Sequence, residues 1–130
     1  MTLQILLAED EALVAMALAD CLEADGHTVT MASDGRKALA AAQYISVLDL
    51  LITDLRMPDL GGEELIRALW AERPGLPVLV VTGSAPPGGL AALRREVGSA
   101  GPLLLRHKPL NYTSLAQAVQ AAVTQIEVLR

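Results

Sequence analysis

The chain has 130 residues, of which 52% are hydrophobic and 19% charged, so it can fold around a core of its own. Its net charge is −5, and its Lys and Arg residues form no run longer than a pair, which argues against a nucleic-acid-binding module. A single cysteine, Cys21, excludes an internal disulfide and a cysteine-based zinc site, and no apolar stretch is long enough to span a membrane.

In chain order, short apolar runs alternate with Ala- and Leu-rich segments of helical spacing. We predict strands near 3–8, 28–32, 47–53, 77–82 and 103–106, and helices near 11–25, 35–45, 61–72, 88–98 and 111–128. The first, third and fourth strands are nearly continuous Leu, Ile and Val, which is typical of parallel strands buried on both faces. Met16 and Met31 are expected in the core. Five strand–helix units with short connections predict an α/β fold, a doubly wound five-stranded parallel sheet with five helices, in one domain spanning 1–130.

Acidic side chains follow two of these strands. Glu9, Asp10 and Glu11 come after the first strand, and Asp54 comes after the third. Ligands of such sheets bind outside the carboxyl ends of the strands, where Thr82 and Lys108 also fall. Clustered carboxylates repel one another unless a hard cation such as Mg²⁺ joins them, and a lysine and a hydroxyl suit phosphate oxygens. The pattern predicts a phosphoryl site in which Asp54 is the acceptor.

Four motifs in order resemble the receiver domain of two-component response regulators, over essentially the whole chain. They are ILLAEDE at 5–11, LITDLRMP at 51–58, VLVVTG at 78–83 and RHKPL at 106–110. The resemblance implies a flavodoxin-like sheet with strand order 2-1-3-4-5 and a single-domain regulator without an output domain. It also implies a phospho-acceptor switch, which assists its own phosphorylation and dephosphorylation but is not an enzyme.

The same resemblance assigns roles to residues. Asp54 would accept the phosphoryl group, Thr82 and Lys108 would bind it, and the bond before Pro109 would be cis. The metal would be Mg²⁺, with Mn²⁺ as a substitute. Its ligands would be carboxylates and one backbone carbonyl: Asp10, Asp54, the carbonyl of Arg56 and, through water, Glu9.

The chain departs from the family pattern at Leu105, three residues before Lys108, where an aromatic residue is usual. We therefore expect the signal to pass through Thr82 and the loop after it. The resemblance also implies that Arg56 and Ser84 tune how fast the phosphoryl group is lost. The phosphodonor would be a histidine kinase or a histidine phosphotransfer protein. The face formed by 88–128 would meet an output protein or a second copy. We expect no nucleic-acid or membrane partner and a cytoplasmic setting.

Three other functions compete with this one. An aspartyl-nucleophile phosphatase usually carries a second Asp two residues after the nucleophile, and here that residue is Arg56. A flavin carrier of similar topology needs aromatic residues around the ring, and two Tyr with one Trp are too few. A degenerate receiver that acts only as a scaffold would not need Asp10, Asp54 and Lys108.

Overall fold

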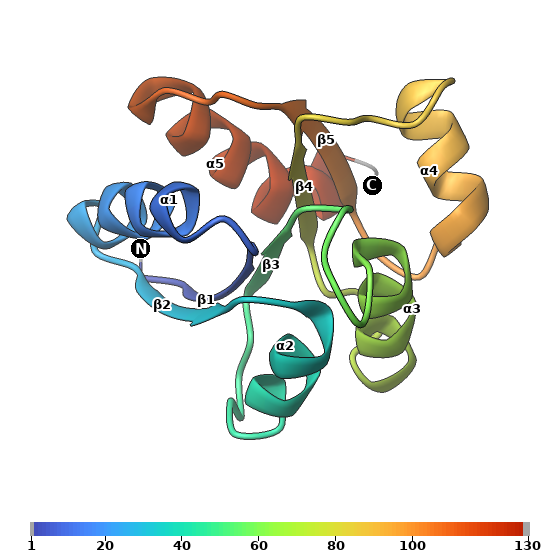
Figure 1. Cartoon of the computed structure of the whole chain (residues 1–130), viewed down its shortest axis with the longest axis horizontal. Helices are drawn as coiled ribbons and strands as arrows, with labels where there is room; N and C mark the ends of the chain where they lie inside the picture. The colour runs from blue at the N-terminus through green and yellow to red at the C-terminus, as the bar shows by residue number, and fades with distance from the viewer. Residues whose placement is uncertain (1, 129–130) are drawn as a thin grey trace.

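The protein is a three-layer α/β sandwich in which one parallel sheet lies between two layers of helices (Figure 1). The computed structural model describes the backbone of residues 2–128 and the side chains of residues 2–124. The sheet has the order β2-β1-β3-β4-β5, with β1 at Gln4–Ala8, β2 at Thr28–Ala32, β3 at Leu50–Thr53, β4 at Val78–Thr82 and β5 at Leu103–His107. The helices are α1 (Ala12–Ala24), α2 (Gly35–Ala42), α3 (Gly62–Glu72), α4 (Gly89–Val97) and α5 (Tyr112–Val128). The predicted fold is confirmed.

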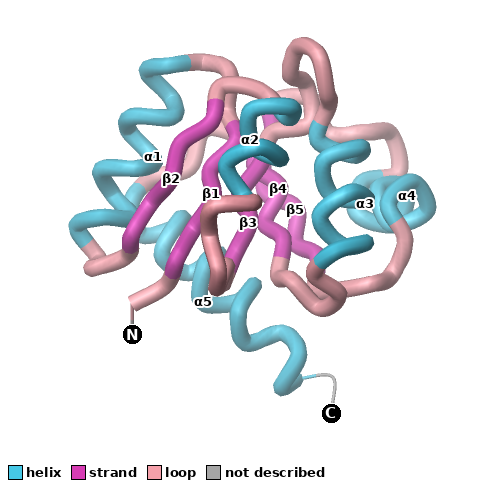
Figure 2. The backbone as a smooth tube through the Cα atoms, turned by 90° about the horizontal axis from the view of Figure 1, so that it is seen from below, coloured by secondary structure: helices cyan, strands magenta, loops and turns pink. Residues whose placement is uncertain are grey.

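Each face of the sheet has its own hydrophobic core. Helices α1 and α5 cover one face, and α2, α3 and α4 cover the other (Figure 2). Leu51 and Ile52 are neighbours and both are fully buried, but they belong to opposite cores, since successive side chains of a strand point to opposite faces. Such burial on both sides explains why the central strands read as continuous apolar runs.

The parallel register brings the carboxyl ends of four strands to one edge of the sheet. Ala8 of β1 pairs with Thr53 of β3, and Thr82 of β4 pairs with His107 of β5. The residues that follow these strand ends therefore meet at that edge.

Two predicted boundaries are wrong. The third strand begins at Leu50 rather than at residue 47, because Val47 is exposed and the Asp49 carboxylate accepts a hydrogen bond from the Gln4 amide instead of continuing the strand. The second helix ends at Ala42 rather than at residue 45, because the next three amides bond three residues back, and Arg73 Nη2 donates to the carbonyls of Ala42 and Ile45.

The expectation that two methionines lie in the core is also wrong. Met16 is 54% exposed on α1, and Met31 is 52% exposed on the edge strand β2. The apolar stripe of α5 is buried at Leu115, Val119 and Ala122. Within the described residues, no helix is both long and apolar enough to cross a membrane.

Candidate functional site

Backbone hydrogen bonds continue the sheet one residue beyond the strand ends and fix the site residues. The Asp54 amide donates to the Ala8 carbonyl at 3.1 Å, and the Lys108 amide donates to the Thr82 carbonyl at 3.0 Å. The Glu9 amide donates to the carbonyl of Ala32 at 3.0 Å. The positions of the acid, the ammonium and the hydroxyl are therefore set by the sheet itself and not by free loops.

Asp54 is buried, and both of its carboxylate oxygens accept hydrogen bonds. Oδ1 accepts from the Leu55 amide at 2.6 Å and, more weakly, from the Arg56 amide at 3.4 Å, while Oδ2 accepts from Lys108 Nζ at 2.7 Å. Burial raises the pKa of the Asp54 carboxyl, but hydrogen bonds, led by the one from Lys108, outweigh burial and hold that pKa below its ordinary value. Asp54 is therefore held ionised and oriented.

Lys108 contacts three acidic side chains at this edge of the sheet. Its Nζ lies 2.7 Å from Glu9 Oε1, 2.7 Å from Asp54 Oδ2 and 3.4 Å from Glu11 Oε1, and its side chain is only 15% exposed. Burial lowers the pKa of the ammonium, but the contacts with Asp54 and Glu9 outweigh burial and raise that pKa well above its ordinary value. Lys108 therefore stays charged, and its bond to Pro109 is cis.

Glu9 faces Lys108 from a buried position at the end of β1. Its Oε2 accepts a hydrogen bond from the Glu11 amide at 3.0 Å, so both carboxylate oxygens have partners. Burial raises the pKa of the Glu9 carboxyl and outweighs the opposing hydrogen bond from Lys108. The sequence predicted that Glu9 acts through the water shell of a metal, and the structure adds a direct ion pair to Lys108.

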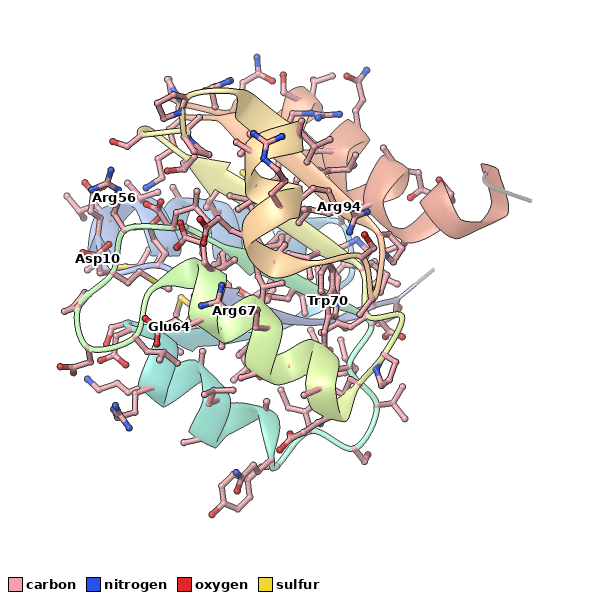
Figure 3. The ribbon with its side chains drawn as sticks, turned by 90° about the vertical axis from the view of Figure 1, so that its right-hand side faces the viewer. Asp10, Arg56, Glu64, Arg67, Trp70 and Arg94 are labelled. Atoms are coloured by element: carbon pink, nitrogen blue, oxygen red, sulfur yellow. The ribbon has the colours of Figure 1, made fainter. Side chains whose placement is uncertain are left out.

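One cavity gathers most of the predicted site residues. It is lined by Asp10, Glu11, Asp54, Arg56, Thr82, Gly83, Ser84 and Lys108. Asp10 and Arg56 lie at the same exposed edge of the molecule (Figure 3). Carboxylate oxygens of Glu9, Glu11 and Asp54 lie within 4.8 Å of one another, while Asp10 lies outside this group and reaches only the cavity wall. The cavity thus offers hard oxygen donors beside one ammonium group.

Thr82 links this cavity to the loop that follows β4. Its side chain is buried, and its Oγ1 accepts a hydrogen bond from the Ser84 amide at 3.1 Å. Leu105, on the neighbouring strand, is half-buried and packs against the core on the side of α2, α3 and α4. An aliphatic side chain therefore occupies the position at which the family pattern has an aromatic residue.

Close approach of backbone holds the loop that follows Asp54. A Cβ at Gly62 would lie 2.2 Å from the Asp54 carbonyl oxygen, and one at Gly35 would lie 2.2 Å from the Leu60 carbonyl oxygen. The Gly62 amide also donates to the Leu55 carbonyl at 3.0 Å. The loop 55–61 is therefore clamped between the starts of α2 and α3, where only glycine fits.

A larger hollow lies at the opposite end of the sheet, near 46–49 and 73–77. Two of its charged residues form hydrogen bonds with main-chain groups. Asp49 accepts from the Gln4 amide, and Arg73 donates to two main-chain carbonyls. This hollow is therefore a product of loop packing, although it is the larger of the two.

Glu11 is the site residue that the sequence analysis did not assign. Its carboxylate lies beside Lys108 and within the acidic group, although it is 66% exposed. One signal was available, because Glu11 is the third of three consecutive acidic residues at the end of β1.

The chain is similar in sequence to proteins of a known family. The family model described as the response regulator receiver domain matches residues 5–120. The chain is 38% identical to a response regulator receiver protein of Anaeromyxobacter sp. over 91 residues, which are 70% of this chain and 38% of that protein. It is 33% identical to the transcriptional regulatory protein FixJ of Rhizobium meliloti over 116 residues, 89% of this chain and 54% of FixJ. The chain therefore spans about two fifths to one half of the length of these curated relatives.

The fold has matches among solved structures as well. The chemotaxis protein CheY4 of Vibrio cholerae superposes with a TM-score of 0.82 at 27% identity, covering 94% of this chain and 99% of that one. A response regulator receiver domain protein of Clostridium thermocellum also gives 0.82, at 25% identity, and covers 98% and 99% of the two chains.

Proposed function

The chain belongs to the response regulator receiver domain family, and from this membership we propose that Asp54 accepts a phosphoryl group from a phosphohistidine. Receiver domains work with histidine kinases and output domains in two-component systems. The donor here would be a histidine kinase or a histidine phosphotransfer protein. The chain would then act as a switch that is phosphorylated, and not as an enzyme that turns over a substrate.

The observation that carries the proposal is the contact of 2.7 Å between Lys108 Nζ and Asp54 Oδ2. A carboxylate must be ionised to attack phosphorus, and the ammonium keeps Asp54 ionised despite its burial. The same ammonium lies where the oxygens of a phosphoryl group on Asp54 would need a positive charge.

The transfer itself demands little covalent chemistry from the protein. An oxygen of Asp54 bonds to phosphorus while the bond from phosphorus to the imidazole nitrogen breaks, and the imidazole keeps the electron pair of that bond. Catalysis of such a step rests on positioning and on neutralising the phosphoryl oxygens. We assign the first task to the backbone bonds that hold Asp54, and the second to Lys108 and the Thr82 hydroxyl.

The donor set of the cavity fits Mg²⁺, which prefers carboxylate and carbonyl oxygens and keeps several waters. Three carboxylates with oxygens within 4.8 Å of one another, and a fourth at the cavity wall, carry more negative charge than Lys108 can offset. When bound, the cation supplies the missing positive charge beside the phosphoryl group; Mn²⁺ could replace it. The proposed ligands are Asp10, Asp54, the carbonyl of Arg56 and, through water, Glu9.

The signal would leave the site through Thr82, because its hydroxyl already bonds the Ser84 amide in the loop before α4. With Leu105 in place of an aromatic residue, this loop is the available route to the face formed by α4, β5 and α5. An output protein or a second copy would bind there. The exposed side chains of Arg56 and Ser84, at the mouth of the cavity, would tune the lifetime of the phosphoryl group.

Labelling with a small phosphodonor tests the proposal. With Mg²⁺ and acetyl phosphate, the wild-type chain should gain the mass of one phosphoryl group, and Asp54→Asn should gain none at that position. Labelling of Asp54→Asn at the wild-type yield would refute Asp54 as the acceptor. Sustained release of phosphate from phosphomonoesters, over many turnovers, would favour a phosphatase, and an unlabelled wild-type chain would favour a scaffold.

A further inference from the structure

Glu11 occupies the N-cap of α1 but does not cap the helix. The N-cap position favours Ser, Thr, Asp and Asn, whose short side chains accept hydrogen bonds from the amides of the first turn. The side chain of Glu11 makes no such bond. It lies instead 3.4 Å from Nζ of Lys108, which is 97 residues further along the chain. The Glu11 carboxylate is thus directed toward the site rather than toward its own helix.

Lys108 has three N–H groups, and three carboxylates surround it. The contacts with Glu9 and Asp54 are both 2.7 Å and involve buried acids, whereas the contact with Glu11 is longer and reaches an exposed acid. An exposed ion pair is the weakest of such contacts. A phosphoryl oxygen that arrives at Asp54 therefore meets an ammonium group whose N–H groups already contact three carboxylates. Of these three partners, Glu11 is the one most easily displaced.

We infer that Glu11 is a positioning residue that competes with the phosphoryl group for Lys108 and so slows phosphorylation of Asp54. This inference rests on the function proposed above. It assigns to Glu11 an effect on rate, exerted through Lys108 and not through contact with the phosphodonor.

Two substitutions separate this competition from simple repulsion of an anionic donor. Glu11→Gln removes the negative charge and with it both effects. Glu11→Asp keeps the charge, but its shorter side chain cannot span the present 3.4 Å contact and suits the amides of the α1 first turn. Competition for Lys108 therefore predicts faster labelling in both variants, whereas repulsion predicts it in Glu11→Gln alone.

The experiment measures the initial rate of Asp54 labelling by acetyl phosphate at fixed Mg²⁺ and low ionic strength. We expect both Glu11 variants to be labelled about two to five times faster than the wild-type chain, as suits the loss of one exposed ion pair. The melting temperature of Glu11→Asp should exceed that of Glu11→Gln, because Asp at the N-cap stabilises α1 and Gln does not. Glu23→Gln, an exposed acid near the other end of α1, is the control and should keep the wild-type rate.

A wild-type rate in Glu11→Gln would overturn the inference while leaving the proposed function intact. A fast Glu11→Gln with an unchanged Glu11→Asp would assign the effect to repulsion and would also overturn it. If the wild-type chain is not labelled at Asp54, the proposed function fails, and the inference fails with it.

Discussion

Lys108 lies between acids that come from two different strand ends, and this contact holds the site together at the residue scale. Asp54 follows β3 and Glu9 follows β1, yet both carboxylates lie 2.7 Å from one ammonium group. Two buried carboxylates without that cation would face uncompensated repulsion and loss of hydration. Lys108 therefore stabilises the fold by compensating the charges of these two buried carboxylates.

Lys108→Met should destabilise the protein, because it keeps the aliphatic stem and removes the charge. Removing one partner of a buried ion pair costs roughly 3 to 5 kcal/mol, and partial exposure of Lys108 places the expected loss in unfolding free energy at about 2 to 4 kcal/mol. Without the ammonium, the pKa values of Glu9 and Asp54 should rise. The loss in unfolding free energy relative to the wild type should therefore become smaller as pH falls and these acids become protonated. Urea unfolding in chelator across the acidic pH range measures both effects.

The matched control is Lys37→Met. Lys37 is 69% exposed and lies 4.0 Å from Asp34, so removing its charge should change stability by no more than about 0.5 kcal/mol. Equal losses in the two variants would contradict the structural role given to Lys108.

The sequence predicted which residues meet at this edge but not how they pair. Apolar runs located the strand ends, and parallel strands require that those ends meet, so Asp54, Thr82 and Lys108 could be placed together. The pairing of Glu9 with Lys108 and the direction of the Glu11 side chain depend on rotamers and local burial. No spacing in the sequence encodes these.

At the scale of elements, the loop 55–61 joins β3 to α3 through contacts that leave no space for a side chain at Gly62. The first residue of α3, Gly62, lies against the main chain of Asp54 and Leu55. Any shift of α3 would therefore act directly on the main chain of Asp54, and any atom added at Gly62 would displace it.

Gly62→Ala should destabilise the protein, although alanine is the better helix former. The gain from helix propensity is at most about 1 kcal/mol, whereas a Cβ would sit 2.2 Å from the Asp54 carbonyl oxygen and would force backbone to move. We expect a net loss of roughly 1 to 3 kcal/mol together with slower labelling of Asp54. Denaturant unfolding and the labelling rate report the two effects.

Gly83→Ala, in the loop that follows β4, provides the comparison. A Cβ at Gly83 would have no atom within 4 Å, and its backbone does not need glycine. Its stability should stay within about 0.5 kcal/mol of the wild type. If Gly62→Ala were equally mild, the close approach would not constrain the loop.

Helix α4 is anchored at one end and loosely started at the other. The Arg94 guanidinium lies 5.7 Å from the centre of the Trp70 ring and donates to the carbonyl of Gly101 at 2.8 Å (Figure 3). Arg67 of α3 donates to the Glu96 carbonyl at 2.8 Å. The N-terminal end instead follows Gly88, which has a left-handed backbone and offers no side-chain cap. The end of α4 nearer to Thr82 is thus the less constrained one.

At the scale of the whole molecule, the sequence predicted the fold correctly but not all of its local details. Alternating apolar runs and helical segments predicted the doubly wound sheet, since strands that alternate with helices form a parallel sheet with helices on both faces. The boundaries at Leu50 and Ala42 were missed because Asp49 and Arg73 bond to backbone distant in sequence. Met16 and Met31 were misplaced because apolar character alone does not say which side of a helix or an edge strand faces solvent.

The strongest prediction for the molecule as a whole is that Mg²⁺ stabilises it. The chain has a net charge of −5, and four carboxylates gather where Lys108 supplies one compensating charge. A cation that binds only the folded state raises the unfolding free energy by RT ln(1 + [L]/Kd), about 2.7 kcal/mol when its concentration is 100 times Kd. For a chain of this length, the melting temperature should rise by roughly 3 to 6 °C for each kcal/mol.

Asp10→Asn and Asp54→Asn separate binding at the site from general screening of charge. Each variant removes one proposed ligand, so each should lose most of the Mg²⁺-dependent rise in melting temperature. Asp20→Asn removes an exposed acid of α1 outside the cavity and should keep that rise. Sodium chloride at matched ionic strength should raise the melting temperature only slightly, because it screens all exposed charges alike and does not take the place of a cation bound at the site. If Asp54→Asn and the wild-type chain rose equally, the cation would be binding elsewhere, and the acidic edge of the sheet would not be a metal site.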